Sequence, residues 1–325
     1  MSFCRAINAP LEAANAAVRA AVRFGLFRRR TAPLPVVSVG NIAMGGTGKT
    51  PLVEALARTL VVSGKRPAIL TRGYRRQGRQ SLVLEGDPGP AWSLAGDEPS
   101  LLAKRLPQVP VVVDANRLRG AERAVALGAQ VAILDDGFQH WPLARDVELV
   151  VVAAGDPLGA QSWRREGPRA LRWANRIVSV GELEEQEKAR ELLAPYHPLP
   201  PFPAALRPLG LQWEENLLPI AALQGRRILA FAGIANPQRF FQTLKKAGAT
   251  LVAVRPFPDH HPYTPRELEA LMDQAYRCGA LPVTTPKDHV RVPPEFQQRV
   301  AVLEVALEAL EEAFASLLVP LLGFR

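Results

Sequence analysis

Continuous runs of aliphatic and β-branched residues alternate with helically spaced apolar residues through the first half of the chain. The runs predict strands at 35–42, 67–71, 109–113, 130–134 and 147–153, and the spacing predicts helices at 51–64, 98–106 and 117–128. Apolar runs without strict alternation are typical of strands that are covered on both faces. Strands that alternate with helices in this way predict a parallel α/β sheet.

A proline-rich and poorly periodic stretch at residues 195–208 interrupts this pattern and suggests a domain boundary. Beyond it the pattern predicts strands at 227–232, 250–255 and 281–285, with helices at 237–247 and 265–278. The chain of 325 residues exceeds the usual size of one domain, which agrees with such a division. We therefore expect a larger α/β domain at residues 31–205 and a smaller C-terminal α/β domain at residues 206–325.

Residues 1–30 predict an amphipathic N-terminal helix. Its apolar positions recur at helical spacing, namely Leu11, Ala14, Val18, Val22 and Leu26. Arg19 and Arg23 interrupt the apolar stripe, and three arginines at 28–30 follow it. This pattern suits a helix in the headgroup layer of a membrane, and equally a helix packed on its own domain. No apolar run reaches the roughly 18 residues that a transmembrane helix needs, and we expect no signal peptide.

Composition places the chain among folded globular proteins, with 48% hydrophobic and 22% charged residues. Its two cysteines, Cys4 and Cys278, offer neither a disulfide framework nor metal-ligand spacing, so we expect a reducing compartment. A net charge of +9 implies an anionic partner, namely nucleic acid, a phosphorylated substrate or acidic lipid. Because the sequence has no aromatic–basic interleaving and no groove-reading motif, we do not expect that partner to be nucleic acid.

The segment VVSVGNIAMGGTGKTP carries the strongest signal, because an apolar strand runs through a glycine-rich turn into a helix. This is the context of a Walker A phosphate loop, although an alanine replaces its first glycine. We expect ATP to be bound by Ala43, Met44, Gly45, Gly46, Thr47, Gly48, Lys49 and Thr50. The glycines let backbone N–H groups approach phosphate oxygens, and Lys49 would reach the β- and γ-phosphates. The alternative is a glycine-rich turn that binds no nucleotide.

An apolar strand that ends in two aspartates predicts the metal site. The segment is VAIL followed by Asp135 and Asp136. Either carboxylate would hold Mg²⁺ directly or through water, together with the Thr50 hydroxyl. The alternative is that the aspartate pair caps a helix or forms a turn, but the nearby phosphate loop favours the metal role.

Eight short blocks in chain order resemble the tetraacyldisaccharide 4′-kinase family. They are GNIAMGGTGKTP, TRGY at 71–74, GDEP at 96–99, DANR at 114–117, LDDGFQH at 134–140, FAGIANPQRF at 231–240, FPDHHPY at 257–263 and TTPKD at 284–288. The resemblance implies a P-loop kinase core that transfers the γ-phosphate of ATP to the 4′-hydroxyl of tetraacyldisaccharide 1-phosphate, forming lipid IVA. It also implies a monotopic enzyme at the cytoplasmic face of the bacterial inner membrane.

The same resemblance implies that Asp97 of GDEP is the catalytic base and that it pairs with a histidine of FPDHHPY, best matched by His260. Lys49 completes this predicted catalytic set. A carboxylate suits the role because the sugar hydroxyl must lose its proton during transfer. Alternatively, Asp97 caps a helix, and His260 and His261 are surface residues or a metal site. Because the two blocks lie in different domains, the pairing predicts a cleft that closes over substrate.

Three arginines are candidates for binding the 1-phosphate of the substrate or the transferred phosphoryl group: Arg72, Arg117 and Arg119. Each of them has the alternative role of a structural ion pair. Lys287 and Asp288 either contact the nucleotide or end a strand, and the sequence does not decide between these roles.

Three rival functions remain open at this point. A ParA/MinD-like ATPase has a signature lysine where this chain has Met44, which argues against that class. A GTPase needs an N/TKxD motif, and the TPKD segment at 285–288 approximates it. A membrane adaptor that uses the phosphate loop only as a switch would bind ATP without transferring phosphate to lipid.

Overall fold

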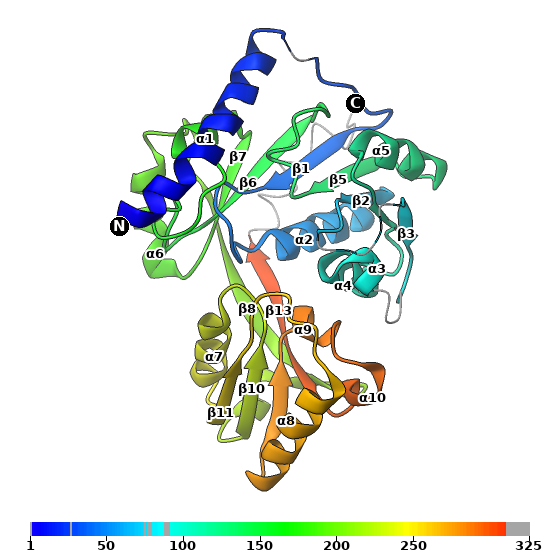
Figure 1. The fold of residues 1–325 in the computed structure, drawn as a ribbon, viewed down its shortest axis with the longest axis vertical. Helices are drawn as coiled ribbons and strands as arrows, with labels where there is room; N and C mark the ends of the chain where they lie inside the picture. The colour runs from blue at the N-terminus through cyan, green and yellow to red at the C-terminus, as the bar shows by residue number, and fades with distance from the viewer. Residues whose placement is uncertain are drawn as a thin grey trace.

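The computed structural model describes residues 2–26, 28–74, 76, 78, 80–87 and 92–309. Its larger unit is built on a mostly parallel sheet with strand β1 at the centre (Figure 1). From one edge to the other the strands are β3 (Leu82–Leu84), β4 (Val111–Val113), β2 (Pro67–Thr71), β5 (Val131–Asp135), β1 (Val36–Gly40), β6 (Val147–Ala153) and β7 (Arg176–Val180). Within this unit β3 is antiparallel, and it lies at the edge of the sheet.

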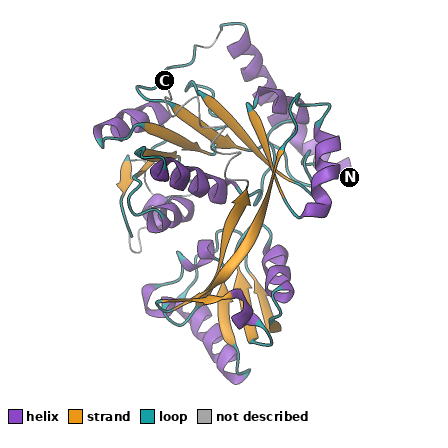
Figure 2. Cartoon of the chain, turned by 180° about the vertical axis from the view of Figure 1, so that it is seen from behind, coloured by secondary structure: helices purple, strands orange, loops and turns teal. Residues whose placement is uncertain are grey.

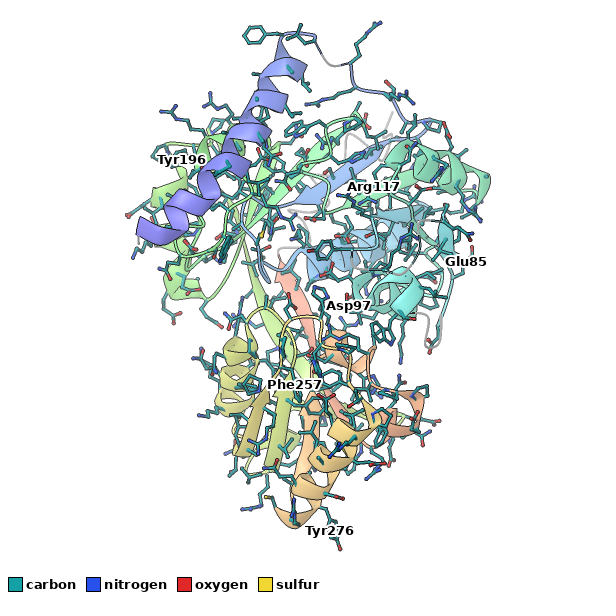
Figure 3. The ribbon with its side chains drawn as sticks, in the orientation of Figure 1. Glu85, Asp97, Arg117, Tyr196, Phe257 and Tyr276 are labelled. Carbon is teal, nitrogen blue, oxygen red and sulfur yellow. The ribbon has the colours of Figure 1, made fainter. Side chains whose placement is uncertain are left out.

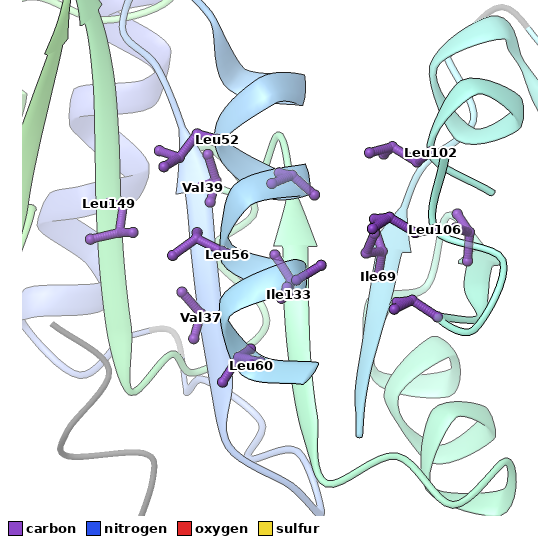
Figure 4. Close-up of a cluster of buried hydrophobic side chains, with 14 of the residues drawn as sticks. Val37, Val39, Leu52, Leu56, Leu60, Ile69, Leu102, Leu106, Ile133 and Leu149 are labelled. Atoms are coloured by element: carbon purple, nitrogen blue, oxygen red, sulfur yellow. The ribbon is translucent and has the colours of Figure 1, made fainter. Parts of the chain in front are cut away.

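Helices cover both faces of this sheet, which confirms the predicted parallel α/β architecture. Helix α2 (Lys49–Val62) buries Leu52, Leu56 and Leu60 against one face, where they meet Val37, Val39 and Ile133 (Figure 4). Helix α5 (Arg117–Ala126) packs its alanines on the opposite face. Strands buried on both sides need apolar residues at every position, and this explains the continuous runs in the sequence.

The smaller unit repeats the pattern with three parallel strands. They are β11 (Thr250–Pro256), β10 (Arg227–Ala232) and β12 (Leu281–Thr284), and they are accompanied by α7 (Pro237–Lys246) and α8 (Pro265–Arg277). A capping box at Thr264 and Glu267 begins α8, where each side chain accepts a hydrogen bond from the other residue's backbone N–H. These elements confirm the predicted strands and helices to within a few residues.

Two long antiparallel strands, β8 (Phe202–Trp213) and β13 (Ala301–Ala309), connect the units (Figure 2). Because β8 also pairs with β7 and β13 with β12, the described strands form one continuous 13-stranded sheet. The expected break at residues 195–208 therefore contains the start of a strand. The register shifts beside Pro208, since a bulge is where a strand tolerates a residue without an N–H.

The remaining described elements are short or peripheral. They are α3 (Trp92–Ala95), α4 (Asp97–Arg105), η1 (Pro168–Trp173), α6 (Leu183–Leu193), β9 (Asn216–Pro219), η2 (Ile220–Leu223), α9 (Pro286–His289) and α10 (Pro294–Gln297). None of the helices in the described part of the chain is long and apolar enough to cross a bilayer.

Helix α1 (Ser2–Arg23) lies outside the sheet and is attached through polar contacts. An ion pair of 2.8 Å joins Glu12 to Arg164, and the amide of Asn15 donates to the carbonyl of Arg165. Arg19 is buried and pairs with Glu166, whereas Leu11 and Val18 are exposed. The predicted helix is therefore present, but an arginine faces the protein and part of the apolar stripe faces outward.

Helix α2 gives a direct test of the core. Replacing fully buried Leu56 with alanine leaves a cavity between α2 and the sheet, and we expect the free energy of unfolding to fall by about 2–5 kcal/mol. Chemical denaturation measures this change. Val62→Ala on the same helix is the control, because Val62 is 88% exposed. Equal losses in the two variants would contradict the packing described here.

Candidate active site

The phosphate loop connects β1 to α2 and depends on glycine. Gly45 and Gly48 have φ angles of +118° and +94°, which side chains with a Cβ rarely adopt. A Cβ on Gly48 would only reach van der Waals contact with Val180 of β7, at 3.4 Å, so the backbone conformation and not the space requires glycine there. Helix α2 begins at Lys49, directly after Gly48, so the positive end of its dipole lies at the loop.

The first half of the loop is held by its own hydrogen bonds. The N–H of Met44 donates to the carbonyl of Trp163 at 2.6 Å, and the N–H of Thr47 donates to the carbonyl of Gly45 at 2.9 Å. The amide of Asn41 donates to the Thr47 hydroxyl at 3.1 Å. Ala43 forms a β-bridge to Arg164. Ala43, Met44 and Thr47 thus shape the loop, while Gly46, Gly48, Lys49 and Thr50 form the turn into α2.

The two aspartates after β5 have different surroundings. Asp135 is buried and accepts a hydrogen bond from the Thr71 hydroxyl at 3.3 Å. Burial, together with the negative charges of Glu98 and Asp136, raises the pKa of Asp135 to about 7.

Asp136 is partly exposed, and its carboxylate lies 3.5 Å from Lys49 Nζ and 2.6 Å from Arg165 Nη1. Burial works to raise the pKa of Asp136, but these two cations outweigh burial and lower it. The lysine of the phosphate loop and the metal candidates are therefore neighbours.

The residues near the loop fit a magnesium ion that also uses nucleotide oxygens. Thr50, Asp135 and Asp136 offer hard oxygen ligands, which Mg²⁺ prefers. Among the described residues, no group of three or more His, Cys, Asp or Glu side chains could hold a metal alone. Mg²⁺ commonly takes one or two carboxylates and completes its shell with phosphates and water, and this arrangement matches that use.

Asp97 is the first residue of α4 and lies where the two units meet (Figure 3). Its Oδ1 accepts a hydrogen bond from the Glu98 N–H at 2.9 Å, and its Oδ2 lies 2.7 Å from His260 Nδ1. The sequence left two histidines open for this contact. His261 turns away, pairs with Glu267 at 3.1 Å and stacks on Phe257, so His260 is the partner of Asp97.

His260 is held in an unusual backbone conformation. Its φ angle is +63°, in the left-handed region that residues other than glycine seldom occupy. The backbone N–H of His260 donates to the carbonyl of Gly233 at 3.0 Å, which fixes the turn. Strained residues of this kind concentrate at functional sites.

A second partner of Asp97 was missed by the sequence analysis. Arg291 is completely buried, and its Nη1 donates to Asp97 Oδ2 at 2.7 Å while its Nη2 donates to the Gly233 carbonyl at 2.9 Å. Arg291 also pairs with Asp288. The only hint in the sequence is that Arg291 follows the TTPKD block by three residues.

Lys287 and Asp288 now have distinct surroundings. Lys287 Nζ donates to Glu98 at 3.1 Å and lies 3.5 Å from His260 Nε2. Asp288 is fully buried, and it accepts hydrogen bonds from the Gly233 N–H and the Tyr263 hydroxyl at 2.8 Å each. A carboxylate buried in this way is not placed to read a guanine base, which argues against the GTPase alternative.

The surroundings of Asp97 keep it ionised. Burial alone would raise the pKa of Asp97, but the hydrogen bond from His260 and the charges of Lys287 and Arg291 lower it. Glu98, which binds Lys287, also contributes to the raised pKa of the metal candidate Asp135. The base candidate and the metal candidates thus share an electrostatic environment, and Asp136 links that environment to Lys49 of the phosphate loop.

Comparison with known proteins places this site in a family. The profile of LpxK, tetraacyldisaccharide-1-P 4′-kinase, matches residues 4–322. The chain belongs to the tetraacyldisaccharide 4′-kinase family. The enzyme of that name from Paramagnetospirillum magneticum is 40% identical over 283 residues, which cover 85% of this chain and 82% of the relative. The one from Methylorubrum extorquens is 42% identical over 288 residues, covering 86% and 83%.

A solved structure extends the likeness to three dimensions. The crystal structure of LpxK from Aquifex aeolicus in complex with ATP has a TM-score of 0.77 and 29% sequence identity to this chain. The match covers 99% of both chains. This kinase family member therefore shares its α/β architecture with an ATP-bound relative.

The three arginine candidates differ in the ion pairs and hydrogen bonds that they already form within the protein. Arg119 forms two bonds to the Asp114 carboxylate, at 2.7 and 2.9 Å, which favours the ion-pair role. Arg117 is buried and donates to the carbonyls of Asp114 and Asp135. Burial lowers the pKa of Arg117 to about 10, and the nearby charge of Arg72 adds to that effect. Arg72 itself is exposed beside the end of β2.

Arg291 gives a test of what keeps the pKa of Asp97 low. Removing its charge in Arg291→Met should raise the pKa of Asp97, so the acidic limb of the kcat/KM profile should move to higher pH. Arg291→Lys keeps a cation and should shift the limb less. Exposed Arg255→Met is the control. A uniform loss of rate with no shift in the profile would mean that Arg291 only supports the fold.

Proposed function

We propose that this protein transfers the γ-phosphate of ATP to the 4′-hydroxyl of tetraacyldisaccharide 1-phosphate. The observation that carries the proposal is the contact between Asp97 and His260, with 2.7 Å between Oδ2 and Nδ1, beside a phosphate loop. A hydroxyl acceptor needs a base near the γ-phosphate. Membership of the family supplies the lipid disaccharide as the substrate class.

The chemistry divides between the two units. The loop glycines and Lys49 hold the β- and γ-phosphates from the larger unit. The substrate's 4′-oxygen attacks the γ-phosphorus, the bond from that phosphorus to the β–γ bridging oxygen breaks, and ADP leaves. Asp97 accepts the hydroxyl proton, while His260 orients the carboxylate. Thr50 with Asp135 or Asp136 would hold Mg²⁺, which when bound neutralises charge on the phosphates.

We further propose that α1 docks on the cytoplasmic face of the bacterial inner membrane. Its polar contacts with residues 164–166 leave Leu11 and Val18 exposed, and just beyond the helix Phe24 and Leu26 are 75% and 81% exposed. Exposed apolar residues next to arginines suit an interfacial helix. A helix that packed its apolar side on the core would have the opposite orientation, so the exposure supports docking.

The transfer reaction is tested with labelled ATP and tetraacyldisaccharide 1-phosphate. Lys49→Ala should abolish formation of the bisphosphorylated lipid, because the γ-phosphate loses its positioning cation. Asp97→Asn should lower turnover by on the order of 10²–10⁴ with ATP binding nearly unchanged. Asp273→Asn, at an exposed aspartate of α8, is the matched control. Full activity in Asp97→Asn would remove that residue from the mechanism.

Wild-type protein that binds ATP but gives no lipid product would instead support the switch alternative. Nucleotide binding and product formation should therefore be measured on the same preparations.

Membrane docking is tested by sedimentation with anionic vesicles. Introducing charge in the double variant Phe24→Glu and Leu26→Glu should release the protein, because two exposed apolar anchors are lost. Tyr276→Glu on α8 is the control, since Tyr276 is also exposed, at 89%, but lies at the opposite end of the molecule from α1 (Figure 3). Unchanged sedimentation of the double variant would refute docking through this end of α1.

A further inference from the structure

A cavity of about 140 Å³ lies on the face of the sheet opposite α2. Its position follows from strand alternation, because Leu149 packs on the α2 face and its neighbour Glu148 points the other way. It is lined by Arg29, Phe138, Trp141, Arg145, Glu148, Trp173 and Asn175. Trp173 and Asn175 are exposed and form its mouth. One water occupies about 30 Å³ in the liquid, so the cavity has room for a larger occupant.

Three guanidinium groups surround the indole of buried Trp141. The Cζ atoms of Arg19, Arg145 and Arg29 lie 4.1, 5.3 and 5.6 Å from its ring centre. The side chains of Arg19 and Arg145 are only 7% and 3% exposed. Burying several like charges together is costly unless counter-charges balance them.

The carboxylates in contact with these arginines do not balance the charge. Arg145 Nη1 lies 3.1 Å from Glu148 Oε2, and Arg19 pairs with Glu166. Among the residues that the structure describes, three guanidinium groups thus contact two carboxylates, and one positive charge remains. Burial raises the pKa of Glu148, and the charges of Arg145, Arg19 and Arg29 oppose that rise.

The hydrogen-bonding groups around the cavity are mostly donors without acceptors. Among the buried atoms with no partner are Arg19 Nη1 and Nη2, Arg29 Nε, Arg145 Nε and Trp141 Nε1. Glu148 Oε1 and the Ser38 hydroxyl are also among these atoms, and Ser38 lies within hydrogen-bonding reach of Glu148. Folded proteins seldom leave such groups unpaired, because each costs about 1–3 kcal/mol. The fitting occupant is therefore rich in acceptor oxygens and negatively charged.

The cavity is preformed by backbone contacts. The N–H of Arg30 donates to the Pro142 carbonyl at 2.7 Å, and the N–H of Ala144 donates to the Arg30 carbonyl at 2.9 Å. These bonds fix Arg29 next to the loop that carries Trp141 and Arg145. The phosphate loop, by contrast, is continuous with α2 on the other face of the sheet.

We propose that this cavity, the α1 pocket, binds a phosphate group. A phosphate offers several acceptor oxygens and the missing negative charge, and guanidinium groups bind it through paired N–H donors. Because Arg19 belongs to α1 and Arg29 follows it, the bound group fastens α1 to the core. The phosphate belongs either to a lipid headgroup that enters past Trp173 or to free inorganic phosphate.

Calorimetric titration with inorganic phosphate tests the free-phosphate source, after Mg²⁺ and a non-hydrolysable ATP analogue have filled the phosphate loop. We expect one further phosphate to bind, and Arg29→Met to weaken its binding about tenfold or more through loss of a charged hydrogen-bond donor. Arg226→Met is the matched control, because Arg226 also lies over a tryptophan, 5.9 Å from the Trp213 ring, but in the smaller unit.

Sedimentation with phosphatidylcholine vesicles, with and without phosphatidic acid, tests the headgroup source. Arg29→Met should weaken binding only to vesicles that contain phosphatidic acid, and exposed Arg28→Met should weaken it much less. A response to inorganic phosphate alone assigns the pocket to the free ion. The proposal is overturned if Arg29→Met changes neither measurement, since water then fills the pocket, or if Arg28→Met loses as much vesicle binding as Arg29→Met, since the attraction is then diffuse.

Discussion

A carboxylate removed from water stays charged only if cations or hydrogen-bond donors stand close by. Asp97 is 5% exposed and belongs to the larger unit, yet His260 and Arg291 both come from the smaller unit. The smaller unit must therefore lie where these two side chains reach Oδ2. Buried Asp288 holds Arg291 in place, and the Gly233 carbonyl fixes both His260 and Arg291. The charge state of the Asp97 carboxylate thus depends on how the two units are placed.

The two strands that connect the units also help to hold the smaller unit in this position. Strands β8 and β13 pair along most of their lengths, so the chain enters and leaves the smaller unit side by side. Arg105 at the end of α4 binds Glu54 of α2 at 2.8 Å and also pairs with Glu304 of β13. One guanidinium therefore ties together the helix that follows the phosphate loop, the helix that begins at Asp97 and a strand that joins the units.

The sequence was sufficient to predict those features that depend only on neighbouring residues, namely most strands and helices and the phosphate loop. The strands at 67–71 and 147–153 have the predicted bounds because continuous aliphatic runs have few other stable states. The phosphate loop was visible because its glycines are required by backbone conformation. Strand β8 was missed because its prolines disturb the alternation that marks a strand.

Local sequence patterns could not predict contacts between residues that are far apart in the sequence. Arg291 meets Asp97 across 194 positions of sequence, and no local spacing reports such a contact. The apolar stripe of α1 was found, but periodicity does not tell which face meets the core, and Arg19 is the residue that is buried. Of the two adjacent histidines, only the fold separates the partner of Asp97 from the ring that stacks on Phe257.

At His260 a strained, left-handed backbone conformation is combined with a side chain that contacts Asp97. Glycine would relieve the conformational strain, which for such residues is on the order of 1–3 kcal/mol, but it would also remove the imidazole from Asp97. Replacement by glycine would therefore trade a relaxed backbone for the loss of one hydrogen-bond partner of a buried carboxylate. Stabilising substitutions are therefore better sought away from this turn, where they leave the contact between His260 and Asp97 intact.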